Sequence, residues 1–199
     1  HLVEASLRLV GERVPQSRPA IRMWIAIETV FLVLHTLFPF AVRKKTRLSE
    51  EDRFKLKIFS LAAHMYWFLD ISKGVRLHLR ALNVADHMPR GGEIASLYAE
   101  HGPACALFGM EKRAVRFIGL ALSIFRELHS LSGEAHTLVF YAVVLLRFSR
   151  FRKAVEVSQE AIEKVKRAGS PWDLHIAGFQ QAYSLYCLGE LEKARDLSK

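Results

Sequence analysis

The sequence predicts an all-α protein, an αα solenoid of about ten helices that repeats every 40 residues or so. Two observations carry this prediction. Helix-forming segments alternate with short corners at a constant interval, and small residues recur at three fixed positions within that interval. Two antiparallel helices approach closely only where side chains are short, so this recurrence indicates hairpins that cross at the same place each time.

The repeat is clearest at residues 94–129, where two helical segments meet at the corner Phe108-Gly109-Met110. The same corner recurs at residues 67–70, 147–150 and 187–190. The registered small residues are Gly102, Ala62, Ala142 and Ala182 in the first segments, then Ala114, Gly74, Ala154, Ala194, Ala121, Ala81 and Ala161 in the second.

Periodicity and end signals predict each helix in turn. The expected helices are residues 2–13, 23–42, 50–68, 72–87, 93–108, 111–129, 133–148, 151–167, 171–188 and 191–199. Ser49, followed by three acidic residues, is typical of a helix start, as is Ser170 before Pro171. Pro103 removes one backbone hydrogen bond, which predicts a kink in its helix.

We expect two parts in the chain. Residues 1–49 would hold a truncated earlier helix pair, a long apolar helix and a basic loop. Residues 50–199 would hold the repeats, at about 50–88, 93–129, 133–168 and 171–199. The sequence starts at His1 and ends inside a helix, which predicts a piece of a longer protein. An uncapped last hairpin would then favour self-association.

The spacing of Gly102, Ala114 and Ala121 resembles the tetratricopeptide repeat, and residues 188–194 resemble that family's usual corner. The period here is longer than the family's 34 residues, and its closing proline is missing. The family's early Trp is replaced by Ile58, Tyr98, Leu138 and Gly178. The chain is therefore similar to the long-helix variant found in arms of bacterial STAND-type ATPase and kinase signalling proteins, and residues 66–85 resemble those arms in particular. The resemblance implies a right-handed superhelix and a regulatory scaffold.

The resemblance also implies a concave groove lined by the first helix of each pair, which would bind a peptide, a helix or another domain of the same chain. If the register transfers, the candidate binding residues are Phe59, Tyr66, Trp67, His136, Arg147, Phe179, Tyr183 and Tyr186. Aromatic residues with a cation suit such binding. The alternative for each residue is that it packs between helices. A small-molecule sensor is a further alternative.

Residues 23–42 are apolar and are followed by the basic segment Arg43–Arg47, which would suit a membrane helix. Glu28, His35 and Pro39 favour instead a helix buried between neighbours. Membrane contact through residues 23–47 therefore stays an alternative to a buried helix with a solvated basic loop.

No residue pattern marks a catalytic, metal or cofactor site. Phosphate-binding glycine motifs and HExxH are absent, and His101 with Cys105 is the one His/Cys pair four residues apart. We therefore expect no enzyme activity, no metal and no cofactor. The net charge is +9, but the basic runs are scattered over different corners, so nucleic acid is not the expected partner. Two distant cysteines fit a reducing cytoplasm.

Overall fold

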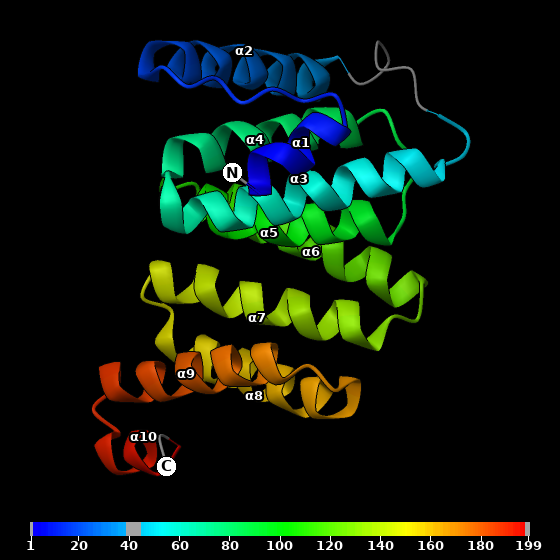
Figure 1. Cartoon of the computed structure of the whole chain (residues 1–199). Coiled ribbons are helices and arrows are strands. Elements are labelled where there is room, and N and C mark those ends of the chain that lie inside the picture. The colour runs from blue at the N-terminus through cyan, green and yellow to red at the C-terminus, as the bar shows by residue number, and fades with distance from the viewer. Residues whose placement is uncertain (1, 39–44, 198–199) are drawn as a thin grey trace. The chain divides into compact units, whose positions relative to one another are not determined.

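The chain folds into helices throughout the computed structural model, which describes residues 2–38 and 45–197 (Figure 1). No strand occurs in those ranges, so the all-α prediction is confirmed. The described helices are α1 (Leu2–Leu9), α2 (Arg18–Leu37), α3 (Glu50–Leu69), α4 (Ile71–Ala85), α5 (Gly92–Leu107), α6 (Glu111–Glu127), α7 (Leu131–Arg147), α8 (Phe151–Ala168), α9 (Pro171–Cys187) and α10 (Leu191–Leu197). They form two compact units, residues 1–89 and 90–199.

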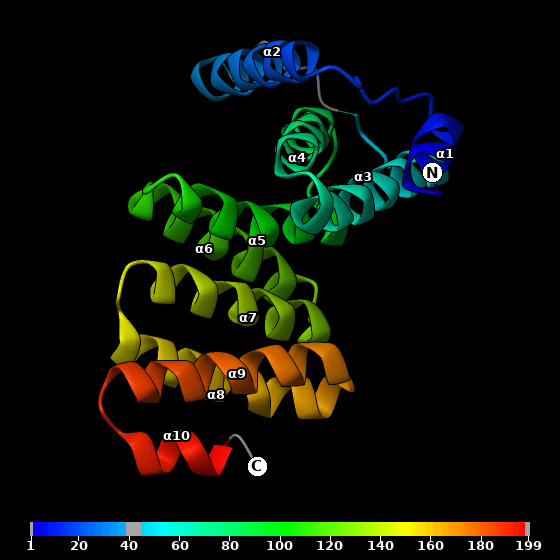
Figure 2. The ribbon, with the colours of Figure 1, turned by 60° about the vertical axis from the view of Figure 1, so that its left-hand side comes forward.

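The second unit is a stack of three helical hairpins, α5–α6, α7–α8 and α9–α10, each packed on the next (Figures 1 and 2). Helix α7 also packs on α5 and on α9, so the first helices form a continuous layer, which we call the inner layer. The second helices α6, α8 and α10 form the outer layer, in which, over the described residues, neighbouring backbones do not approach one another closely. The predicted concave groove along the first helices stays a prediction.

The registered small residues lie where the hairpins cross. Those of the three complete hairpins, α3–α4, α5–α6 and α7–α8, are all buried: Ala62, Gly74, Ala81, Gly102, Ala114, Ala121, Ala142, Ala154 and Ala161. At Gly102 the approach is so close that an added Cβ would lie 2.7 Å from the side chain of Ile118 on α6. The packing reason given for the repeat is therefore confirmed.

The corners of the second unit also recur with the repeat. Gly109, Ser149 and Gly189 end the first helices in the left-handed region, with φ of 74°, 57° and 80°. His129 and Gly169 do the same between hairpins, with φ of 50° and 78°. A left-handed residue after a helix satisfies its last carbonyl groups and reverses the chain. The same backbone device therefore repeats every 40 residues, as the sequence register does.

The first unit joins the first hairpin to the N-terminal helices. Helix α3 packs on α4, α1 packs on α3, and α2 packs on α4. Residues 50–89 thus lie in the same compact unit as the N-terminal helices. The expected division of the chain at residue 49 stays a prediction. Helix α2 begins at Arg18, five residues earlier than expected, because Ser17 caps it and Pro19 fits its first turn.

Other expectations concern single segments. Helix α5 runs through Pro103 without a break in its helical assignment, and the kink there stays a prediction. Residues 39–44 lie outside the described part of the chain. They include the end of the expected helix 23–42 and the first two residues of the basic segment Arg43–Arg47. Among the residues that are described, no helix has both the length and the apolar character needed to span a bilayer.

Candidate functional site

The strongest candidate for a binding surface is a row of aromatic side chains on α9, which we call the α9 stripe. It consists of Trp172, Phe179, Tyr183 and Tyr186, with exposed fractions of 63%, 63%, 47% and 63%. Intervals of seven, four and three residues place side chains on one face of a helix. The rings of Phe179 and Tyr183 stack, with centroids 6.2 Å apart and planes at 16°.

The polarity of α9 is inverted. While the stripe exposes large aromatic rings, the opposite face buries polar groups: Asp173, Gln180, Gln181 and Ser184 are 8%, 3%, 9% and 0% exposed. Ala177, with no exposure, is the small residue among them. A helix that only needed to pack would turn its rings inward. Exposed rings on a well-packed helix indicate a surface that serves something other than this unit's own core.

Helix α7 lies beside α9 in the inner layer and is joined to it by His136 and Asp173. The ring nitrogen Nδ1 of His136 and the Oδ1 of Asp173 are 2.9 Å apart, and Ser170 donates to the other carboxylate oxygen at 2.8 Å. Burial favours the neutral form of His136, but the hydrogen bond and charge of Asp173 outweigh it and raise its pKa. The edge of the His136 ring meets Phe140, with centroids 4.7 Å apart.

The pKa of Asp173 is lowered, because the bonds from His136 and Ser170 outweigh burial, which alone would raise it. Within the stripe, the neighbouring Cys187 thiol raises the pKa of Tyr183. The Tyr183 hydroxyl is therefore a neutral hydrogen-bond donor at physiological pH. Helices α7 and α9 thus offer exposed rings, the hydroxyl groups of Tyr183 and Tyr186, and the exposed cation Arg147 at the end of α7.

The structure brings five of the eight predicted binding residues together on α7 and α9. These are His136, Arg147, Phe179, Tyr183 and Tyr186. The other three lie in the first unit, on α3. Phe59 and Tyr66 are buried, at 0% and 6% exposure, so their predicted place on an open groove is wrong. Trp67 is half-buried.

The same register position is buried on another helix as well. Val139 of α7, which lies 40 residues before Phe179, is 3% exposed and belongs to a core cluster with Ala177 of α9. The large apolar side chains that α3 exposes are instead Phe54, Leu61, Met65 and Phe68, at 52%, 61%, 43% and 80%.

Sequence reasoning also missed Trp172, Phe140 and Asp173. The signal for Trp172 was present, because it lies one heptad before Phe179 on the same face. Asp173 reads from the sequence only as a first-turn acid beside the N-cap Ser170. Its contact with His136 crosses 37 residues of chain and needs the stacked structure to be seen.

The pair formed by His101 and Cys105 gives little support for a nucleophilic cysteine. The Cys105 sulfur lies 3.3 Å from Nε2 of His101, but both residues are buried. Burial raises the pKa of Cys105 to about 11, so the thiol stays protonated at neutral pH. Over the ranges that the structure describes, no three His, Cys, Asp or Glu side chains gather to hold a metal ion.

Three cations of the basic runs are paired with acids of the same chain. The ion pairs are Arg150 with Glu111 at 3.1 Å, Lys153 with Glu156 at 2.8 Å and Lys164 with Glu134 at 3.1 Å. Such pairing lowers the local positive field that a nucleic-acid backbone would need.

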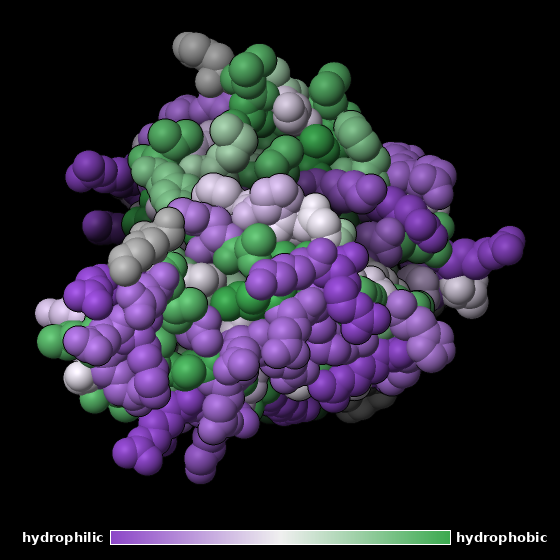
Figure 3. Space-filling view, turned by 90° about the horizontal axis from the view of Figure 1, so that it is seen from below, coloured by the Kyte–Doolittle hydropathy of each residue, from purple (hydrophilic) through white to green (hydrophobic). Residues whose placement is uncertain are grey.

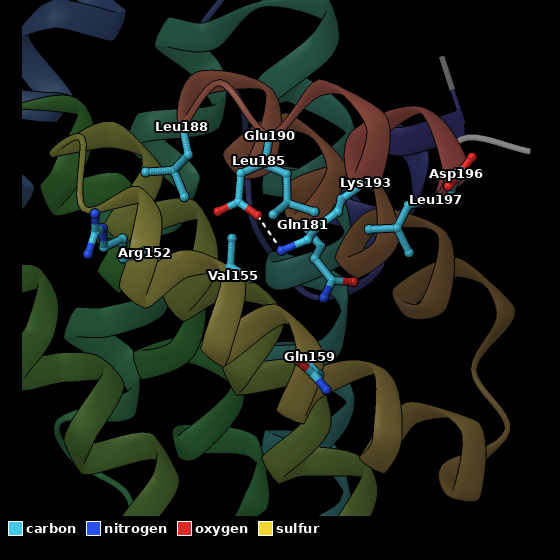
Figure 4. A pocket seen from close by; sticks show the side chains of 10 residues that line it. All are labelled: Arg152, Val155, Gln159, Gln181, Leu185, Leu188, Glu190, Lys193, Asp196 and Leu197. Carbon is cyan, nitrogen blue, oxygen red and sulfur yellow. Dashed lines mark hydrogen bonds and ion pairs between the residues drawn. The ribbon is translucent and has the colours of Figure 1, made fainter.

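A hollow of about 720 Å³ opens between α8 and α10 on the outer side of the stack (Figure 4). Its charges balance: Arg152 and Lys193 face it together with Glu190 and Asp196, and Lys193 binds Glu190 at 2.6 Å. In the view from the α10 end, hydrophilic side chains cover most of the surface (Figure 3). The predicted self-association through this end stays a prediction.

Comparison with known proteins adds no relative: the sequence matches no protein-family model and no curated protein.

Proposed function

We propose that this chain is a protein-interaction module, and that the α9 stripe holds an amphipathic helix of a partner protein. The observation that carries the proposal is the inverted polarity of α9, which exposes four large rings and buries four polar side chains. Exposed aromatic rings are the residues that dominate binding energy at protein interfaces.

The dimensions of the stripe favour a helix as the ligand. From Trp172 to Tyr186 the stripe is about 21 Å long, which matches some four turns of a second helix. A row spaced by seven, four and three residues presents ridges that a partner's i, i+4 and i+7 side chains can fit. The protonated Tyr183 hydroxyl and the Arg147 guanidinium would add polar contacts at the edge.

The wider role follows from the repeat. A stack of hairpins resembling tetratricopeptide repeats suits a regulatory arm of a larger signalling protein, which is the role we propose for it. Cys105 and Cys187 are both unpaired, and an exposed free thiol such as Cys187 fits a reducing compartment. We therefore propose that the module works in the cytoplasm.

The test is a helical peptide library displayed on phage and selected against the whole chain. Affinities of the selected peptides are then measured by fluorescence anisotropy. The double variant Phe179→Ala plus Tyr183→Ala should weaken binding at least about tenfold, since buried aromatic anchors contribute about 2 kcal/mol or more each. Circular dichroism checks that the variant keeps its helices.

The matched control is Val115→Ala plus Leu191→Ala, two exposed apolar residues of the outer layer, on α6 and α10. This variant should bind the selected peptides like the unmodified chain. If peptides bind the stripe variant and the unmodified chain equally well, the proposed site is rejected.

A further inference from the structure

Helix α2 in the first unit also has inverted polarity. Its one acidic side chain, Glu28, is 2% exposed, and it shares the face packed on α4 with Ile21 and Leu32, at 3% and 8%. The side chains facing away are large and apolar, with exposures between 43% and 63%: Met23, Val30, Phe31, Val33, Leu34, Leu37 and Phe38. Trp24, at 38%, lies at the edge of this face, with its ring centroid 5.7 Å from the guanidinium of the buried Arg76 on α4.

Polar contacts fix this orientation. Asn83 of α4 donates to the Glu28 carboxylate at 2.7 Å and to the Glu28 backbone carbonyl at 2.8 Å. Arg80 of α4 lies 3.8 Å from the same carboxylate. Near the other end of α2, His35 and Asp86 are 3.0 Å apart. Turning the apolar face inward would break these contacts and leave buried polar groups unpaired, so the apolar face is held outward.

The outer face is large and free of negative charge. It covers about half the circumference of the helix and, from Met23 to Phe38, about 22 Å of its length. Both charged side chains that α2 exposes are cations, Arg18 and Arg22, and neither forms an ion pair with a described residue. Helical geometry places Arg22 at one edge of the apolar face. After α2, Arg47 is also exposed, whereas Lys45 is paired with Asp52 at 2.8 Å.

Apolar residues in the middle with cations at the edge are what an interfacial helix presents to a membrane. Such a helix lies in the plane of the bilayer, with its apolar side among the acyl chains and its cations at anionic headgroups. A protein partner would more commonly meet a rim carrying both signs of charge. This arrangement does not require a helix that spans the bilayer.

We propose that the outer face of α2 binds the surface of an anionic lipid bilayer. The proposal concerns the first unit and is independent of the function proposed for the α9 stripe. Bound in this way, α2 lies parallel to the membrane, with Phe31 and Leu34 inserted and Arg18 and Arg22 at the headgroups.

The test is flotation of the whole chain through a sucrose gradient with vesicles of phosphatidylcholine alone or mixed with phosphatidylglycerol. The chain should float with the mixed vesicles and stay at the bottom with phosphatidylcholine alone. Phe31→Glu plus Leu34→Glu should abolish flotation. The control is Leu61→Glu plus Phe68→Glu on α3, which makes the same chemical change at positions that are even more exposed, 61% and 80% against 50% and 43%, and should leave flotation unchanged.

A second variant, Arg18→Gln plus Arg22→Gln, keeps the apolar face and removes both cations. It should reduce flotation with mixed vesicles, and raising the salt concentration should do the same to the unmodified chain. The proposal is overturned if the unmodified chain does not float with mixed vesicles, or if the α3 variant loses flotation as the α2 variant does. It is also overturned if the α2 variant instead converts a dimer into a monomer in size-exclusion chromatography, since a second copy would then cover the face.

Discussion

Gly133 of α7 lies directly against the ring of Phe125 of α6. A Cβ added to Gly133 would be 2.1 Å from Cδ1 of Phe125 and 2.3 Å from its Cε1, far inside van der Waals contact. Phe125 is only 6% exposed and packs in a cluster with Ala95 and Ile124, so its ring has no open space to enter. The missing side chain of Gly133 is therefore what lets the first two hairpins of this unit nest.

Gly133→Ala should destabilise the chain by about 1–3 kcal/mol, because the overpacking exceeds the gain of about 1 kcal/mol that alanine normally brings to a helix. Urea unfolding followed by circular dichroism measures the difference. The control is Gly119→Ala in α6, where an added Cβ meets nothing within 4 Å. That change should stabilise the chain by about 0.5–1 kcal/mol. Equal effects at the two glycines would contradict the nesting argument.

The packing role of Gly133 could not be predicted from the sequence. The repeat was readable because small residues at hairpin crossings recur with it, as Ala114 and Ala154 do. Gly133 does not recur, and from the sequence it is only the first residue of the expected helix 133–148. Its importance depends on a ring eight residues earlier, in another helix.

Part of the candidate site was also predictable from a sequence period. The exposed rings of α9 follow the helical period, so Phe179, Tyr183 and Tyr186 could be found. Phe59 and Tyr66 could not be placed correctly, because one register position differs in burial from helix to helix. Val139 is 3% exposed, whereas Phe179, 40 residues later, is 63% exposed. Such differences depend on which neighbouring helix covers the position, and they leave no trace in a repeat counted by length alone.

Substitutions of Glu28 and of Asn83 should have strongly coupled effects on the free energy of unfolding. Glu28→Leu removes the carboxylate acceptor of the buried Asn83 amide and leaves it only the backbone carbonyl of residue 28, which should cost about 1–3 kcal/mol. Adding Asn83→Leu removes that amide, so the double variant should be less destabilised than the sum of the single variants by about 1 kcal/mol or more. Urea unfolding of the four proteins gives this coupling. Additive effects would show that the two side chains do not interact in solution.

Stability should depend on pH through His136 and Asp173. Because the pKa of His136 is raised, the charged ring contributes fully to the free energy of unfolding below pH 6.5, the ordinary pKa of histidine. This contribution is lost as the pH rises through the raised pKa. The lowered pKa of Asp173 means that its contribution is present above 3.8 and is lost as pH falls. The pair therefore stabilises the fold most between these two values and less above neutrality.

Urea unfolding of the unmodified chain and of His136→Gln at about pH 6 and about pH 8.5 measures this effect. The stability difference between the two proteins should shrink at the higher pH. The variant is needed as reference because His78, whose burial lowers its pKa to about 4, gives the opposite dependence in the acid range. A difference that grew with pH would show that His136 is not held by Asp173.

The α9 stripe should contribute little to the stability of the fold, which separates a docking surface from a structural one. Phe179→Ser plus Tyr183→Ser removes two exposed rings and their stacking, so we expect a loss of less than about 1 kcal/mol. Ala177→Leu, on the buried side of the same helix, should cost about 1–3 kcal/mol, because the side chain has no space around it. Thermal and urea unfolding compare the two. If the serine variant proved the more damaging, the rings would belong to the core in solution, and the inverted polarity that supports a partner helix would not exist.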